Sequence, residues 1–157
     1  MSATTSTDHA VWLASLTRSL TAVSRHTHSP ALYSRMAEKA GLSLRPHLVD
    51  VLFRVAELQP VRISEVAETM AYDRSTISRH VAELAEEGLV ERSTDPDDGR
   101  AVIVRLSRRG ASAVNRIEQA WYETLEELTA GWSDRDRTSF LRQLDRLDKA
   151  LADLDED

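Results

Sequence analysis

The sequence predicts a mainly helical protein with one small β-hairpin, and three observations carry this expectation. Apolar residues recur at helical spacing through most of the 157 residues, and residues that begin or end helices flank these segments. Only the stretch from residue 89 to residue 106 changes to the alternating pattern of strands. With 41% hydrophobic residues, the chain has enough apolar material for one domain, or for a small domain with an appended helical arm.

The N-terminal third predicts two helices. Residues 1–8 are rich in Ser and Thr and carry no basic start before an apolar stretch, so we expect a disordered tail rather than a signal peptide. Apolar residues at helical spacing predict a first helix from His9 to about His28. Ser29 is a suitable cap for a second helix, Pro30 is a suitable first residue, and Gly41 ends it.

A third helix is predicted to begin at Pro46 and to end before Pro60. A short helix from Ile63 to Met70 follows it. The buried face of the third helix is expected to consist of apolar residues at helical spacing, namely Leu48, Val51, Leu52 and Val55.

The helix predicted from Arg74 to Glu87 has the clearest ends. Asp73 is a good N-cap, and Gly88 supplies the left-handed residue that a helix end favours. Only residues 71–72 separate Asp73 from the short helix before it, so the two helices are joined by a tight turn.

Two strands are predicted next, over residues 89–93 and 101–106, around a loop of turn-forming residues at 94–100. Together they form a β-hairpin. Ser107 is a suitable cap for a long helix that runs to about Ala130.

Ser133 begins a last helix whose apolar residues are spaced 4, 3, 4 and 3 residues apart: Phe140, Leu144, Leu147, Leu151 and Leu154. This spacing suits an intramolecular core strip as well as a dimer seam, and spacing alone does not separate the two.

A short helix, a tight turn, a second helix and a hairpin together make a winged helix-turn-helix. In the second helix Ile77, Val81 and Leu84 share one face and are expected to fix it to the core. A groove-facing side is expected opposite them, since small and polar side chains enter a major groove about 12 Å wide without steric block. That side consists of Ser75, Ser78, Arg79 and Ala82, flanked by Thr76 and His80.

Charge is expected to limit the DNA contact to the first two turns of this helix. Arg74 and the N-terminal amides favour phosphate, whereas Glu83, Glu86 and Glu87 in the second half are repelled by it.

The net charge of −6 is not spread evenly along the chain. Residues 1–122 carry 15 basic and 15 acidic residues, whereas residues 123–157 carry 5 basic and 11 acidic residues. The excess acid therefore lies in the C-terminal arm and does not oppose DNA binding elsewhere, because a DNA-reading face needs only local positive charge. Of the 20 basic residues 18 are Arg, the residue type that suits bidentate contacts to phosphate and guanine.

The wing leaves two roles open for Arg100. It follows a loop that contains Asp95, Asp97 and Asp98, so Asp98 is a candidate to pair with Arg100 and support the wing. Alternatively, Arg100 reaches into a narrow minor groove, which attracts guanidinium groups.

The helix-turn-helix and the wing resemble the MarR family of bacterial regulators. The resemblance covers about residues 10 to 150 and rests on five runs taken together: Ile63–Glu68, Asp73–Val81, Leu84–Val90, Asp95–Arg100 and Leu106–Gly110.

The resemblance implies an obligate homodimer that binds palindromic operators, usually as a repressor, and that small phenolic or other amphipathic ligands often release. It implies a DNA-binding domain over residues 43–107 between dimerisation helices over 9–42 and 108–157. The bases would be read by Ser75, Thr76, Ser78 and Arg79, with Arg100 as the wing-tip contact. The dimer contacts would include Phe140, Leu144, Leu147 and Leu151.

The chain departs from the family pattern at two helix starts, where Arg45 and Arg62 stand in place of capping hydroxyls. It also contains no cysteine, which excludes disulfides and the peroxide-sensing cysteine branch of the family.

Candidate ligand contacts are weaker than the DNA contacts. Trp12, His47 and Trp121 are candidates to line a cavity between the dimer arm and the reading head, although large aromatics at helical spacing more often pack in a core. His26 and His28 do not share a helix face, so we expect no metal site there. We also expect no cofactor.

No phosphate-binding loop, nucleophile elbow or metal-spaced His/Glu set is present, so the sequence predicts no enzyme. The alternative function is a winged-helix protein-interaction module without DNA binding, which a small, polar reading face argues against. No run of 18 apolar residues occurs, and a cytoplasmic location is the simplest expectation.

Overall fold

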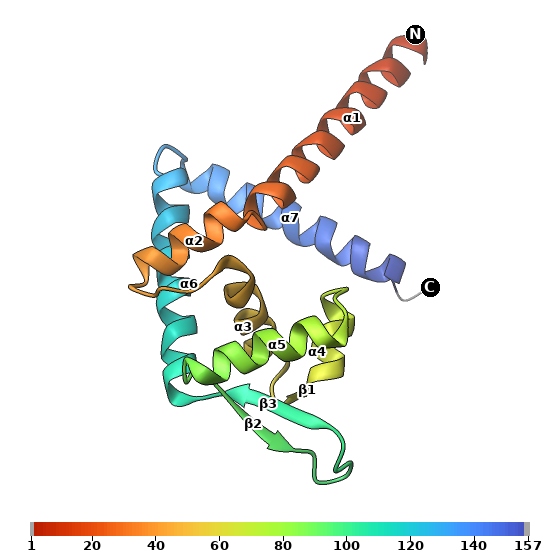
Figure 1. Ribbon diagram of the computed structural model, residues 1–157. Coiled ribbons are helices and arrows are strands. Elements are labelled where there is room, and N and C mark those ends of the chain that lie inside the picture. Colours follow the sequence, from red (N-terminus) through yellow and green to blue (C-terminus); the bar gives the residue numbers. More distant parts are fainter. Residues whose placement is uncertain (1, 156–157) are drawn as a thin grey trace. The chain divides into compact units, whose positions relative to one another are not determined.

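The computed structural model describes residues 2–155, and the side chains of residues 8–154. Its elements, labelled in Figure 1, form two compact units, residues 1–120 and 121–157. The helices and strands follow in the order α1 (Ser2–Thr27), α2 (Pro30–Lys39), α3 (Pro46–Leu58), β1 (Val61–Arg62), α4 (Ile63–Thr69), α5 (Arg74–Glu86), β2 (Val90–Thr94), β3 (Val102–Leu106), α6 (Arg108–Leu128) and α7 (Asp134–Asp155). The chain is therefore mainly helical with a small antiparallel sheet, as predicted.

Helix α1 begins at Ser2, so the prediction of a disordered tail over residues 1–8 was wrong for residues 2–8, while Met1 lies outside the described residues. Neither Pro nor Gly occurs in the first 28 residues, so no helix-breaking residue opposes extension of α1 toward the N-terminus. The apolar side chains of α1 are largely exposed: Val11, Trp12, Leu13, Leu20 and Val23.

The predicted caps hold the helix starts. The hydroxyl of Ser29 accepts a hydrogen bond from the Leu32 amide at 3.2 Å, and the hydroxyl of Ser107 accepts one from Gly110 at 2.9 Å. Gly88 follows α5 with a φ of +68°, a conformation that side-chain-bearing residues rarely adopt.

The core of the first unit lies between α3, α4, α5 and the sheet. It contains the predicted face of α3 (Leu48, Val51, Leu52, Val55) and the predicted face of α5 (Ile77, Val81, Leu84). Leu48 is 4% exposed, and the other side chains of these two faces are fully inaccessible to solvent. Burying α5 on this face leaves its other side to solvent.

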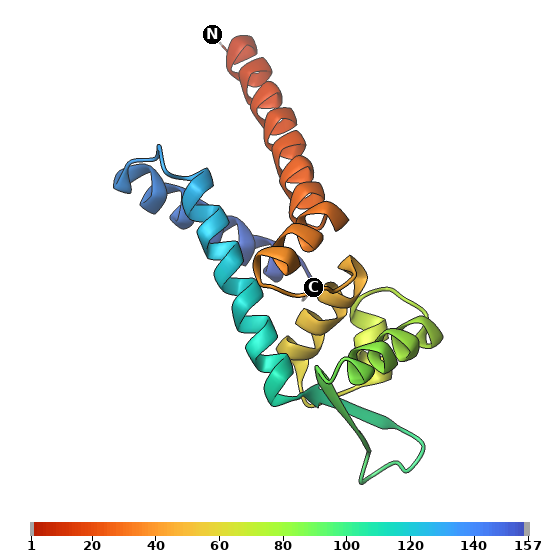
Figure 2. The same ribbon diagram turned by 60° about the vertical axis from the view of Figure 1, so that its left-hand side comes forward.

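The sheet has three strands in the order β1-β3-β2, one more than the predicted hairpin. The added strand β1 is only two residues long and pairs Val61 with Val104 and Arg62 with Ile103. Strands β2 and β3 form the hairpin, which projects from the helices of its unit in both views (Figures 1 and 2). The side chain of Gln59, at the end of α3, accepts a hydrogen bond from the Leu106 amide at 2.7 Å and joins the helix to this sheet.

The second unit contains the end of α6 and all of α7. Trp132 and Phe140 pack edge to face at 5.3 Å, and the Arg137 guanidinium donates to the Thr129 carbonyl at 2.9 Å. None of the helices over residues 2–155 combines the length and the hydropathy that a membrane span requires.

Candidate nucleic-acid interface

Helix α5 presents a polar side to solvent. Arg74, Ser75 and Arg79 are exposed, and Ser78 is half-buried, while Ile77 on the opposite side is fully buried. Within the described residues the Arg79 guanidinium forms no ion pair. Its charge is therefore available to an external partner.

The start of α5 is held by Asp73. Its carboxylate accepts hydrogen bonds from the Thr76 amide at 2.9 Å, from the Thr76 hydroxyl at 2.6 Å and from the Ser75 hydroxyl. The hydroxyls of Ser75 and Thr76, and then the Thr76 amide, hold the pKa of the Asp73 carboxyl far below its usual range. The Asp73 carboxylate therefore already occupies the Thr76 amide, and the attraction of the remaining N-terminal amides for phosphate stays a prediction.

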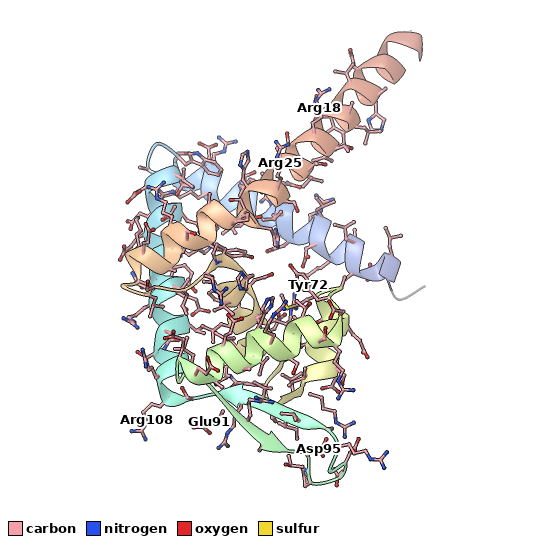
Figure 3. All side chains as sticks on the ribbon, in the orientation of Figure 1. Arg18, Arg25, Tyr72, Glu91, Asp95 and Arg108 are labelled. Carbon is pink, nitrogen blue, oxygen red and sulfur yellow. The ribbon has the colours of Figure 1, made fainter. Side chains whose placement is uncertain are left out.

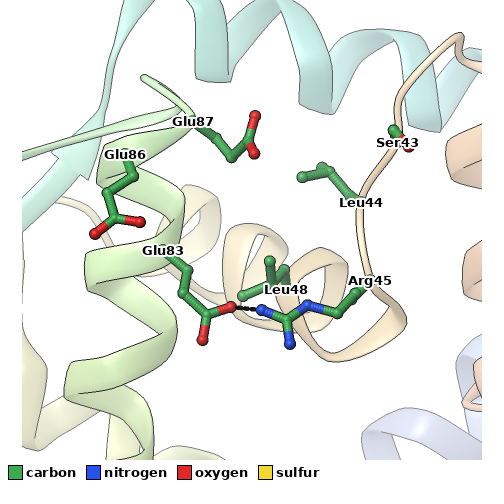
Figure 4. Close-up of a pocket in the computed structure, with 7 residues that line it drawn as sticks. All are labelled: Ser43, Leu44, Arg45, Leu48, Glu83, Glu86 and Glu87. Carbon is green, nitrogen blue, oxygen red and sulfur yellow. Dashed lines mark hydrogen bonds and ion pairs between the residues drawn. The ribbon is translucent and has the colours of Figure 1, made fainter.

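The acidic half of α5 is turned toward the loop between α2 and α3. Arg45 of that loop forms an ion pair with Glu83, and the two side chains line a cavity of about 160 Å³ with Glu86 and Glu87 (Figure 4). That only the first two turns of α5 contact DNA stays a prediction.

The wing is braced by a buried carboxylate at the point where its loop leaves β2. Asp95, which Figure 3 places on the wing, is only 4% exposed. It accepts a hydrogen bond from Arg62 Nε at 2.6 Å and from the Asp97 amide at 2.8 Å. The Asp97 amide and the Arg62 guanidinium hold the pKa of the Asp95 carboxyl below its usual value, although its burial opposes them. The wing loop is thereby tied to β1 and the start of α4.

Asp98 supports the wing tip through the backbone. Its carboxylate accepts a hydrogen bond from the Arg100 amide at 3.0 Å, and its carbonyl accepts one from the Ala101 amide at 2.8 Å. Arg100 is exposed, and its guanidinium forms no ion pair within the described residues. Of the two roles left open for the Arg100 side chain, bracing by Asp98 is not observed.

His80 is buried, so its inclusion among the DNA contacts was wrong. Its side chain is 8% exposed, and its ring lies 4.5 Å from that of His47 on α3 and 6.5 Å from that of Tyr72. It lies one residue before Val81 and four before Leu84, so it occupies the edge of the core-facing side of α5. The His80 Nδ1 atom has no hydrogen-bond partner among the described residues.

This histidine pair is expected to make the stability depend on pH. Burial, and then the charges of His47 and Arg79, lower the pKa of His80 below its ordinary 6.5, and burial and Arg45 do the same for His47. Asp73 opposes the shift of His80 but does not reverse it. The unfolded chain therefore takes up protons first as the pH falls below about 6.5, while the folded chain resists them.

We therefore expect the free energy of unfolding to be highest above about pH 6.5. It should fall as the pH drops from there through the lowered pKa values of His80 and His47. Urea unfolding at a series of pH values measures it. His80→Phe should flatten the dependence, whereas His26→Phe, on the exposed part of α1, should leave it unchanged. An equally steep dependence in His80→Phe would contradict the assignment.

The three candidate ligand contacts lie on different elements. Trp12 is exposed on α1 and stacks on His9 at 6.0 Å, His47 contacts His80, and Trp121 is half-buried on α6. None of them lines the two described cavities, of which the larger, about 340 Å³, is formed by Gly131, Trp132, Asp136 and Phe140. Within the described residues no three His, Asp or Glu side chains are placed to hold a metal ion.

The apolar stripe of α7 is exposed on the single chain. Phe140 is 51% exposed, Leu144 43% and Leu151 52%, while Leu147 is half-buried. Phe140 packs on Trp132 within its own unit, and the dimer seam stays a prediction.

The ion pairs that Arg45 and Arg62 form were not predicted from the sequence. Both stand at N-cap positions and neither side chain caps its helix. Each instead forms an ion pair with a distant element, Arg45 with Glu83 and Arg62 with Asp95. The missing capping hydroxyl at each position was a signal in the sequence that the arginine has another role. The acidic partners are 38 and 33 residues away, so the sequence did not identify them.

Known proteins are similar to this chain in sequence. The family model described as the MarR family matches residues 44–102, from the loop before α3 to the start of β3. The chain is 31% identical over 123 residues to an uncharacterized HTH-type transcriptional regulator of Bacillus subtilis (strain 168), YxaD, covering 78% of this chain and 86% of that protein. It is 34% identical over 102 residues to a putative transcriptional regulatory protein for the hcr operon of Thauera aromatica, covering 65% of this chain and 61% of that protein.

Solved structures share the fold. A MarR family protein from Bacillus stearothermophilus superimposes with a TM-score of 0.74 at 21% identity, covering 89% of this chain and 95% of that one. The apo form of wild-type MarR from E. coli gives a TM-score of 0.72 at 22% identity, covering 84% and 95%. At these identities the likeness concerns the fold alone.

Proposed function

Because the chain belongs to the MarR family of transcriptional regulators, we propose that it is a sequence-specific DNA-binding regulator that acts as a homodimer on a palindromic operator. The observation that carries the proposal is the solvent-facing start of α5, where Arg74 and Arg79 are exposed on a helix whose opposite side is fixed in the core. The side between them is small and polar, which argues against the alternative of a protein-interaction module.

In the proposed complex two copies place their α5 helices in successive major grooves, about 34 Å apart. The exposed Arg100 of each wing lies against a neighbouring minor groove. The exposed apolar stripe of α7 supplies contacts between the two copies.

The regulator acts as a repressor in this proposal. One of its relatives, 28% identical over 101 residues that cover 56% of that protein, is the HTH-type transcriptional repressor IacR of Pseudomonas putida. A small amphipathic ligand that favours a different spacing of the two reading heads would lower operator affinity by a coupling free energy.

Arg79→Ala is expected to weaken operator binding by about 1–3 kcal/mol and to relax base preference at one position in each half-site, because a bidentate contact between arginine and guanine is lost. Affinities for the operator and for single-base variants of it measure both effects. Arg146→Ala, on the exposed face of α7, is the control. An equal loss on all sequences would make Arg79 a phosphate contact instead.

The proposed function itself is tested by selecting binding sites from random DNA with the full chain. A recurrent palindrome with two half-sites supports the proposal. If no sequence is enriched above the starting pool, the protein-interaction alternative is favoured.

A further inference from the structure

The carboxylate of Asp73 controls which hydrogen-bonding atoms the start of α5 offers to DNA. It accepts from the hydroxyl of Ser75, from the hydroxyl of Thr76 at 2.6 Å and from the Thr76 amide at 2.9 Å. An ionised carboxylate only accepts hydrogen bonds, so in both side-chain pairs the hydroxyl must be the donor.

The carboxylate is ionised at pH values near neutrality. The two hydroxyls and the amide lower the pKa of Asp73 far below the usual range of an aspartate. The direction of these hydrogen bonds is therefore fixed by charge and does not depend on pH near neutrality.

Each hydroxyl has one proton and two lone pairs. Because Ser75 and Thr76 both give their proton to Asp73, their oxygens have only lone pairs left to present outward. Ser75 is exposed and Thr76 is half-buried, and both belong to the first turn of α5, which the proposed complex places against DNA.

Most of the DNA surface is unsuited to such oxygens. Phosphate oxygens, guanine O6 and N7, and thymine O4 are all acceptors. The exposed Asp73 charge also repels phosphate. The remaining partners in the major groove are the amino groups at adenine N6 and cytosine N4, which are donors.

The next turn of α5 has the opposite character. The Arg79 guanidinium is exposed, unpaired within the described residues and able only to donate. The reading side of α5 is thus divided into an accepting region at its start and a donating region in the turn that follows.

We propose that Asp73 is a specificity-determining residue, which turns the Ser75 and Thr76 hydroxyls into obligate acceptors that read adenine or cytosine amino groups rather than phosphates. This proposal rests on the proposed function. Asp73 touches no base itself and acts by positioning the two hydroxyls.

The test uses the full chain and the operator obtained by selection. Ser75→Ala and Thr76→Val remove an acceptor each, and each is combined with three altered DNAs. The first lacks one amino group, with purine replacing adenine or pyrimidin-2-one replacing cytosine. The second lacks a purine N7 atom, and the third has a neutral methylphosphonate at one phosphate.

We expect removal of the contacted amino group to weaken wild-type binding by about 2- to 10-fold more than it weakens binding of the matching variant, which is the size of one net hydrogen bond. The N7 and methylphosphonate changes should affect both proteins equally. The proposal is overturned if removal of N7 or of a phosphate charge weakens binding of the wild type more than binding of either variant. It is also overturned if both variants bind every DNA with the affinity of the wild type. Failure of the wild-type chain to select any DNA would instead overturn the proposed function.

Asp73→Asn tests the role of the carboxylate directly. Asparagine caps helices as well as aspartate does, but its amide has one accepting oxygen in place of two, so at least one hydroxyl proton is released. We expect coupling to N7 or to phosphate to appear in this variant. Asp145→Asn removes the same charge from an exposed position of α7 and should leave the coupling pattern of the wild type. An unchanged pattern in Asp73→Asn would contradict the role assigned to Asp73.

Discussion

Gly110→Ala is expected to lower the free energy of unfolding by about 3 kcal/mol, because the new methyl group has no room. A Cβ at this position would lie 1.8 Å from the carbonyl oxygen of Leu89 and 2.9 Å from its carbonyl carbon. Both atoms belong to the backbone, so no side-chain rotation relieves the clash. The Ser107 hydroxyl holds this contact from both sides, since it donates to the Gly88 carbonyl at 2.6 Å and accepts from the Gly110 amide.

The direction of this effect is opposite to that of helix propensity. Gly110 lies in the first turn of α6, where alanine would otherwise stabilise by up to about 1 kcal/mol. Thermal unfolding should show a drop in Tm of roughly 6–12 °C for a chain of this size. Gly131→Ala is the matched control, because no atom lies within 4 Å of the added Cβ. An unchanged or raised Tm in Gly110→Ala would refute the close packing of α6 on Leu89.

The sequence predicted most of the helix ends because their signals are local. Asp73 and Gly88 specify the two ends of α5 within a few residues, and the structure confirms both. Ser29 and Ser107 did the same for α2 and α6. At each of the three helix starts the capping side chain and the amide it satisfies are three residues apart.

The features that the sequence did not predict depend on contacts between distant residues. Strand β1 has only two residues and exists because Val61 pairs with Val104, 43 positions later. The burial of His80 depends on the ring of His47 from another helix. No local pattern distinguishes a buried histidine at the edge of a core face from an exposed one beside a reading face.

The candidate site was predicted in its location more than in its chemistry. Arg79 and Arg100 are exposed and without ion pairs among the described residues, as a DNA contact requires. The hydroxyls of Ser75 and Thr76 were expected simply to read bases. Their hydrogen bonds to Asp73 determine the kind of atom they can contact, and this required side-chain geometry.

A second large effect is expected from the apolar stripe of α7. We expect Leu144→Glu combined with Leu151→Glu to convert the proposed dimer to a monomer, because it places charges on side chains that are 43% and 52% exposed in the single chain and that a second copy would cover in the proposed dimer. A monomer engages one half-site at a time, so operator affinity should fall by about 100- to 10,000-fold as the effective concentration of the second head is lost. Sedimentation and operator titration measure the two effects.

Thr138→Glu combined with Ala152→Glu is the matched control for this variant. It adds the same two charges to exposed positions of α7, but outside the stripe that contains Leu144 and Leu151. Because these positions lie roughly on the other side of the helix, the control should remain dimeric and lose affinity only through the added negative charge. A dimer that survives the stripe substitutions would show that α7 does not join the two copies, and a monomeric wild type that still binds both half-sites tightly would show that a dimer is not needed.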